Sequence, residues 1–198
     1  QSLRIVEVLE YEGKGLNLTW EVRDGISHHT GGQRASTLEG QIVAIADRVA
    51  YVNHDIDDAI RGGVISEAEL PVESTEVLGH NHGARITTMV HDMVGSSLDS
   101  DEIRMSPRVW DAMMALREWL FANVYFSERA KSEAPKAYHL VQELFFYYLA
   151  HPEELPEEYA PVGPDCLVQS VVDYVAGMTD RFAIRTYERL FLPTRWRM

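Results

Sequence analysis

Apolar residues recur along most of this chain at intervals of three and four residues, the spacing of one face of an α-helix. The longest such segment runs from Leu38 to about Arg61, with Thr37 as its N-cap and Gly62-Gly63 as its stop. The same reasoning predicts helices over residues 2–10, 17–27, 66–70, 84–97, 107–125, 135–150, 165–177 and 179–191. No stretch shows the sustained polar–apolar alternation of a hairpin. The sequence therefore predicts an all-α, bundle-like fold.

The pattern gives no sign of a division into domains. There is no internal repeat, no low-complexity tract and no linker long enough to separate two domains. We therefore expect residues 1–198 to form a single all-helical unit. No run of 18 apolar residues occurs, so no membrane-spanning segment is expected.

Charge and cysteine content narrow the possible partners and location. The chain has 31 acidic and 18 basic residues and a net charge of −13, which disfavours general binding to nucleic acid. Cys166 is the one cysteine, so no internal disulfide and no cysteine-rich zinc site is expected. The sequence begins Gln1-Ser2-Leu3-Arg4, which does not resemble a secretory signal, and a cytoplasmic location is the expectation.

One face of the 38–61 helix concentrates the candidate chemistry. Asp47, Tyr51, Asp55 and Asp58 follow one another at steps of four, four and three, within roughly a quarter-turn of the helix surface, and Arg48 lies at the edge of this arc. Carboxylates, a phenol and a guanidinium so placed can bind a divalent metal and a phosphorylated ligand. The same spacing also describes a solvated helix face, and spacing alone leaves both interpretations open.

Other polar residues give weaker signals. Six basic residues are either members of a phosphate pocket or surface charges: Arg85, Arg104, Arg108, Arg117, Arg129 and Lys131. The histidines at 28, 29, 80 and 82 lie in predicted loops, where solvation is more common than metal binding. His54 and Asp55 are adjacent, and on a helix they point about 100° apart. No His-Glu-x-x-His, Walker loop or Gly-x-Ser-x-Gly occurs.

Four segments together resemble a known family. Residues Leu16–Ile26, Leu38–Val43, Ala46–Ala59 and Ala176–Ala183 are similar, in the same order, to segments of the bacterial deoxyguanosine triphosphate triphosphohydrolase-like proteins, which are HD-domain enzymes. The matches extend over most of the chain. On this resemblance, residues 1–65 correspond to the end of the HD core and residues 66–198 to a C-terminal helical region.

The resemblance implies an all-α enzyme that hydrolyses a dNTP to the deoxynucleoside and inorganic triphosphate. It implies a divalent metal, Mg²⁺ or Mn²⁺, held by a histidine, a His-Asp pair and a later aspartate that matches Asp47. It also implies that Arg48 faces phosphate, that Tyr51 and Asp55 line the nucleotide site, and that the protein forms homo-oligomers. A hard carboxylate for the metal and a cation for phosphate suit these roles.

The chain departs from the family pattern in one respect. The family's metal-binding histidine and His-Asp pair, and the histidine that assists its chemistry, lie upstream of the segment that matches Gln1. We therefore expect residues 1–198 alone to hold no metal at Asp47 and to hydrolyse no dNTP. Two alternatives remain: a non-catalytic helical binding or assembly module, and an HD phosphohydrolase that acts on another nucleotide.

Overall fold

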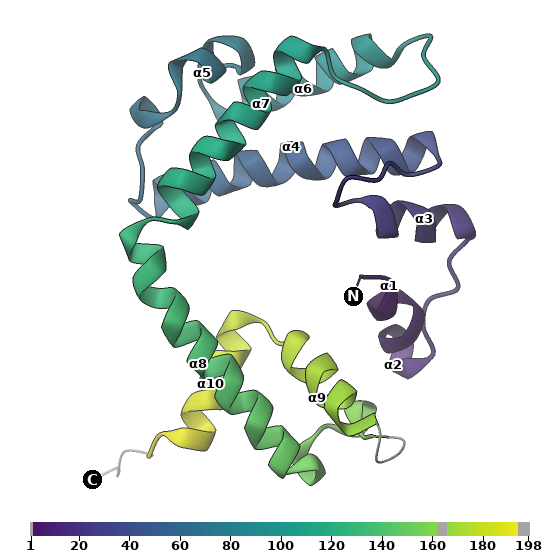
Figure 1. The fold of residues 1–198 in the computed structure, drawn as a ribbon, viewed down its shortest axis with the longest axis vertical. Helices are drawn as coiled ribbons and strands as arrows, with labels where there is room; N and C mark the ends of the chain where they lie inside the picture. The colour runs from purple at the N-terminus through teal and green to yellow at the C-terminus, as the bar shows by residue number, and fades with distance from the viewer. Residues whose placement is uncertain (1, 162–165, 194–198) are drawn as a thin grey trace. The chain divides into compact units, whose positions relative to one another are not determined.

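The computed structural model describes residues 2–161 and 166–193, with the backbone alone for residues 128–131. Every regular element in these ranges is a helix, and no strand occurs in them (Figure 1), which confirms the all-α prediction. By its contacts the chain divides into two compact units. Unit 1 contains residues 1–7 and 16–127, and unit 2 contains residues 8–15 and 128–198.

The main helices of unit 1 are connected by short loops. They are α3 (Trp20–His28), α4 (Leu38–Arg61), η2 (Glu67–Glu69), α5 (Val72–Leu78), α6 (His82–Ser97), α7 (Pro107–Leu120) and the π-helical turn η3 (Phe121–Tyr125). Unit 2 contains α8 (Glu128–Ala150), η4 (Pro152–Glu154), η5 (Glu157–Tyr159), α9 (Leu167–Ala176) and α10 (Asp180–Phe191). The N-terminal turns α1 (Ser2–Arg4), η1 (Ile5–Leu9) and α2 (Glu10–Gly13) are shared between the two units.

The division between the units falls at Ser127, whereas the family resemblance placed the end of the HD core near residue 65. These two boundaries have different origins. The boundary at Ser127 separates two groups of residues that contact one another little, whereas the boundary near residue 65 marks the end of the sequence motifs of the HD core. The sequence contains no linker that would mark the division at Ser127, since only Phe126 and Ser127 separate η3 from α8.

Local capping explains where the helices begin. The Thr37 hydroxyl accepts a hydrogen bond from the Gly40 amide at 3.1 Å and caps α4. Ser106 caps α7 and Pro107 takes its first position, as the sequence predicted. α8 differs from the prediction, because it starts at Glu128 and carries Pro135 inside it rather than at its first turn. A proline there removes one helical hydrogen bond, a loss that the rest of this 23-residue helix offsets.

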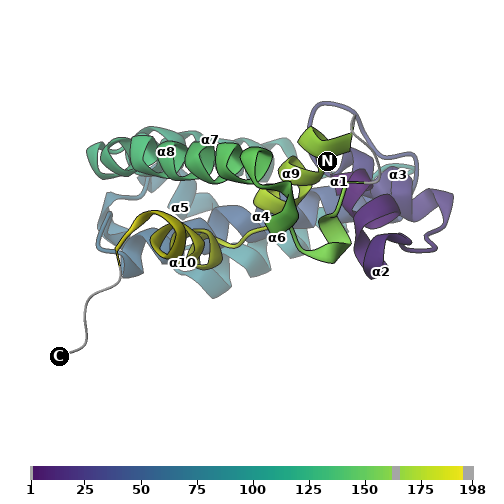
Figure 2. The same ribbon diagram turned by 90° about the horizontal axis from the view of Figure 1, so that it is seen from below.

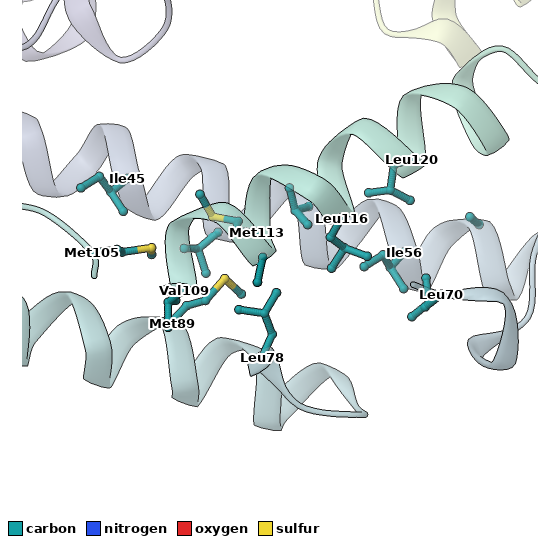
Figure 3. Close-up of a cluster of buried hydrophobic side chains, with 14 of the residues drawn as sticks. Ile45, Ile56, Leu70, Leu78, Met89, Met105, Val109, Met113, Leu116 and Leu120 are labelled. Carbon is teal, nitrogen blue, oxygen red and sulfur yellow. The ribbon is translucent and has the colours of Figure 1, made fainter. Parts of the chain in front are cut away.

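The core of unit 1 lies between α4, α5, α6 and α7 (Figure 3). α4 contributes Val49, Val52 and Ile56 to it, and Ile56 is fully buried. Met89 of α6 and Leu116 of α7 are fully buried against the same cluster. Burial of a side chain of this size stabilises a fold by about 1.5–3 kcal/mol. Rotation of α4 about its own axis would expose the row of buried side chains Val49, Val52 and Ile56, called the buried seam of α4 below, so this row fixes the orientation of the helix.

Unit 2 has its own, largely aromatic core. α9 and α10 each pack against α8 (Figures 1 and 2). Leu144, Tyr148 and Val171 are buried there, and the rings of Tyr148 and Tyr174 meet edge to face at 5.0 Å. Burial and the hydrogen bond with Tyr148 raise the pKa of Tyr174 to about 12, so this hydroxyl stays protonated at neutral pH.

α3 and α4 approach each other closely through two glycines. A Cβ placed on Gly40 would lie 2.7 Å from the Ala35 Cβ and 3.2 Å from the Gly25 Cα. The first of these distances is shorter than real Cβ contacts, so a side chain at residue 40 would push α3 and the 29–37 loop away from α4.

We predict that Gly40→Ala lowers the free energy of unfolding by about 1–3 kcal/mol, because the added methyl group overpacks the α3–α4 contact. Gly95→Ala in α6 is the matched control, since nothing lies within 4 Å of an added Cβ there. That control should raise stability by about 0.5–1 kcal/mol through lower backbone entropy in the unfolded chain. Urea unfolding followed by circular dichroism measures both, and equal effects of the two substitutions would contradict the packing argument.

Candidate functional site

The candidate residues all belong to α4, and the buried seam of that helix determines where each one lies. Asp47 and Asp58 are exposed, whereas Arg48, Tyr51 and Asp55 are half-buried at the margins of the core. The structure thus brings four of the five to one helix face, and it gives them different neighbours. Their roles in binding stay predictions.

Tyr51 contacts an arginine from α7. The Nε–H of Arg117 donates a hydrogen bond to the Tyr51 hydroxyl oxygen. The guanidinium carbon of Arg117 lies 4.7 Å from the centre of the Phe121 ring, a cation–π distance. These contacts hold the guanidinium beside the phenol and leave a cation at the margin of the α4 face.

Asp55 contacts a tyrosine from η3, one helical turn further along α4. The Tyr125 hydroxyl donates a hydrogen bond to Asp55 Oδ2. Burial raises the pKa of the Asp55 carboxyl above its ordinary value, and the nearby charge of Asp58 raises it further, while His54 acts in the opposite direction. Tyr51, Asp55, Arg117 and Tyr125 are called the tyrosine–aspartate cluster below.

The four members of this cluster come from two distant parts of the sequence. Tyr51 and Asp55 are four residues apart on α4, and Arg117 and Tyr125 are eight residues apart on α7 and η3, so each pair shares one helical face. The sequence predicted Tyr51 and Asp55, listed Arg117 only among six basic candidates, and missed Tyr125. The i, i+8 spacing of an arginine and a tyrosine on one predicted helix was the available signal.

Asp47 lies apart from this cluster, at the edge of a cavity of about 720 Å³ between α3 and α4. The cavity is also lined by His29, Glu39 and the apolar side chains Val22, Ile26 and Val43. His29 Nδ1 is 2.6 Å from the Ile26 carbonyl oxygen and donates a hydrogen bond to it.

Within residues 2–161 and 166–193, no group of three or more His, Cys, Asp or Glu side chains is arranged to hold a metal ion. Asp47 is exposed and open to a ligand, and it supplies a single carboxylate. The described residues therefore provide no complete metal site.

Arg48 lies beside a different cavity from its neighbour Asp47. Its guanidinium carbon is 5.6 Å from the centre of the Trp110 ring of α7. It lines a pocket of about 240 Å³ together with Arg34 and Arg104. Adjacent residues on a helix point about 100° apart, which accounts for the separation.

Arg85 and His82, two of the other polar candidates, form a contact between α4 and α6. Arg85 is fully buried, and its Nε–H donates to Asn53 Oδ1 at 3.0 Å. The Asp57 carboxylate lies 2.7 Å from His82 Nδ1 and 3.9 Å from Arg85 Nη2. Burial lowers the pKa of the Arg85 guanidinium. Arg85 thus joins two helices inside unit 1. The side chains of Arg129 and Lys131 lie outside the described part of the chain.

Comparison with known proteins adds two findings. A family model described as a phosphohydrolase-associated domain matches residues 103–189. Three similar curated proteins, each named deoxyguanosinetriphosphate triphosphohydrolase-like protein, come from Caldanaerobacter subterraneus subsp. tengcongensis, Desulfatibacillum aliphaticivorans and Clostridium tetani. They are 47%, 42% and 40% identical over 99%, 98% and 97% of this chain, and the alignments cover 58%, 61% and 58% of their own lengths. The chain therefore spans about three fifths of the length of these relatives.

We predict that Asp58→Asn lowers the pKa of Asp55, because it removes the like charge that disfavours the Asp55 carboxylate. A raised folded-state pKa means that folding favours the protonated form, so this contribution to stability is present at low pH and is lost as the pH rises through the folded-state pKa. NMR titration of the carboxyl carbons measures the shift. Asp111→Asn, which removes an exposed charge on α7, is the control and should leave Asp55 unchanged.

Proposed function

The chain belongs to the deoxyguanosinetriphosphate triphosphohydrolase-like family, and on that premise we propose that the complete protein hydrolyses a dNTP to the deoxynucleoside and inorganic triphosphate. The observation that carries the proposal is the tyrosine–aspartate cluster, two of whose members, Tyr51 and Asp55, lie on the same helix as Asp47. It supports a nucleotide site because it combines hydroxyl, carboxylate and guanidinium groups at the margin of one helix face.

The cluster offers specific groups to a nucleotide. Asp55 accepts a hydrogen bond from Tyr125 through Oδ2, and Oδ1 can accept another from a sugar hydroxyl. Arg117 uses Nε for Tyr51, and its two terminal nitrogens can donate to phosphate oxygens. The phenol rings of Tyr51 and Tyr125 present apolar faces to a sugar or base. Binding by these groups would orient the ligand before reaction.

The proposed reaction adds one water to the dNTP. A P–OH bond forms at the α-phosphorus, the bond from that phosphorus to the 5′ oxygen breaks, and the 5′ oxygen takes a proton. A divalent ion such as Mg²⁺ or Mn²⁺, when bound, supplies Lewis-acid polarisation of the phosphate and lowers the pKa of water. In this chain Asp47 would be one of its ligands, and Arg48 would be a cation that neutralises phosphate charge.

Because the described residues form no group of three or more side chains able to hold a metal ion, we propose that residues 1–198 alone release no triphosphate from dGTP. Exposed apolar side chains on α3 and α4, including Trp20, Leu38 and Val43, support burial against further protein, and we propose a homo-oligomer for the complete protein. Within the described residues, no helix is both long and apolar enough to cross a membrane.

We predict that Asp47→Asn in the complete protein lowers the rate of dGTP hydrolysis by at least about a hundredfold, because the metal loses a charged ligand. Asp111→Asn, an exposed aspartate on α7, is the matched control and should keep full activity. The assay measures deoxyguanosine and inorganic triphosphate with Mn²⁺ present. Full turnover by Asp47→Asn would refute the assignment.

Two other functions predict different results in binding and product measurements on the complete protein. A non-catalytic helical binding or assembly module would show no heat of binding when Mn²⁺ and dGTP are titrated into the complete protein. A phosphohydrolase of another nucleotide would release a different product, such as pyrophosphate or a monophosphate. Product analysis therefore separates the three.

A further inference from the structure

Unit 2 contains a polar cavity of its own, with a volume of about 460 Å³. Its wall is formed by side chains from α8, η4, α9 and α10, four elements of the same unit (Figure 1). The cavity is called the α10 cavity below, and the side chains on which its chemistry depends are Arg185, Arg189 and Phe182 of α10, Tyr148 of α8, Tyr174 of α9 and Glu154 of η4. None of these residues belongs to the set assigned to the dNTP site.

Two arginines of the α10 cavity lie one helical turn apart. Cβ atoms at positions i and i+4 of a helix are about 5–6 Å apart, so Arg185 and Arg189 can both reach one anion. Both residues are exposed, and no ion pair joins either of them to another residue in the described part of the chain. Like charges at this spacing destabilise a helix. A bound anion would remove this repulsion and would find two guanidinium groups free to contact it.

The carboxylate that lines the α10 cavity is bonded to a different side chain. Glu154 Oε1 accepts a hydrogen bond from the Tyr147 hydroxyl at 2.7 Å. This bond raises the pKa of the Tyr147 hydroxyl, so the hydroxyl keeps its proton at neutral pH. Glu154 therefore leaves both arginines of the cavity without a counter-charge. Because a carboxylate has several acceptor positions, Glu154 can also accept a hydrogen bond from a hydroxyl group of a ligand.

Two tyrosines give the α10 cavity a rigid wall with a hydroxyl donor. Tyr148 is buried, and the hydroxyls of Tyr148 and Tyr174 are hydrogen-bonded to each other. Two hydroxyls bonded in this way use one of their two protons, so the other proton can be donated to a ligand. The two rings meet edge to face at 5.0 Å within the core of unit 2. Their positions are therefore set before a ligand binds.

Phe182 gives the α10 cavity an apolar side. It is 47% exposed, and together with Tyr174 it also lines a neighbouring cavity of about 410 Å³. That second cavity is lined further by Tyr159, Met178 and Glu158. A ring of a ligand can lie against the face of Phe182 while an anionic group of the same ligand contacts the arginines. The surroundings thus fit a ligand with one charged end and one ring.

We propose that the α10 cavity binds a phosphate monoester of a ring compound, with the phosphate on Arg185 and Arg189 and the ring against Phe182. A phosphate monoester carries a charge close to −2 at neutral pH, which matches two guanidinium groups. Arginine donates to phosphate oxygens in pairs of hydrogen bonds. A carboxylate or a phosphate diester carries one negative charge, and it would leave one arginine unpaired. The ligand is then either a sugar phosphate or a nucleoside monophosphate, which share this chemistry.

Isothermal titration of deoxyribose 5-phosphate into the complete protein, with EDTA present, tests this site without catalysis. The wild type should bind, and Arg185→Gln with Arg189→Gln should weaken binding at least tenfold through the loss of two charge-assisted contacts. Arg181→Gln is the matched control, because Arg181 is an exposed arginine of α10 outside the cavity wall. This control should leave the affinity within twofold.

A second titration with dGMP identifies the source of the phosphate monoester. Tighter binding of dGMP than of deoxyribose 5-phosphate, with the difference lost in Phe182→Ala, favours a nucleoside monophosphate, and equal or weaker binding of dGMP favours a sugar phosphate. Arg48→Gln separates the α10 cavity from the dNTP site, because Arg48 is the cation proposed for the substrate phosphate.

Three results would each overturn the α10 site. They are absence of binding of both ligands to the wild type, unchanged affinity in the double arginine variant of confirmed helicity, and a loss in Arg48→Gln that the double variant does not show. None of them depends on whether the protein hydrolyses dGTP with Mn²⁺, so the α10 site and the proposed function succeed or fail separately.

Discussion

The burial of one side of α4 is the constraint on which the rest of unit 1 depends. Val49, Val52 and Ile56 enter the core together with side chains from α5, α6 and α7. A helix held along several turns by such a seam has no freedom to rotate, and every other residue on it then has a fixed direction. The positions of Asp47, Arg48, Tyr51 and Asp55 follow from this apolar contact and not from attraction among themselves.

That geometry separates chemistry that is contiguous in sequence. Asp47 and Arg48 are neighbours, yet one borders the cavity beside α3 and the other borders a cavity beside Trp110. Tyr51 and Asp55 are reached instead by side chains of α7 and η3. A single helix thus contributes to three separate environments, and α7 contributes to two of them through Trp110 and Arg117.

Much of this fold was predictable because its signals are local. The α4 boundaries follow from the Thr37 cap and the Gly62-Gly63 stop, and both depend on residues within one turn of the helix end. The pairing of Tyr51 with Arg117 was not predictable, because 66 residues separate them and spacing on one helix does not tell which helix will face it. Glycine contacts such as Gly25–Gly40 were hidden for the same reason, since a glycine in a sequence is equally a turn or a stop signal. The start of α8 was misplaced because Pro135 was interpreted as a first-turn proline.

Gln41 joins two loops through its side-chain amide. One partner, Ile103, is 62 residues from Gln41 in the sequence, and the other, Ala35, is six residues from it. A single amide group therefore satisfies backbone groups in both loops, and replacing it would leave a buried donor or acceptor in each. The two loops are for this reason coupled through one side chain. A chimera that takes residues 29–37 from one relative and residues 98–106 from another should keep its helices but lose the register between these loops, unless both parents place a glutamine-like fork at the start of α4.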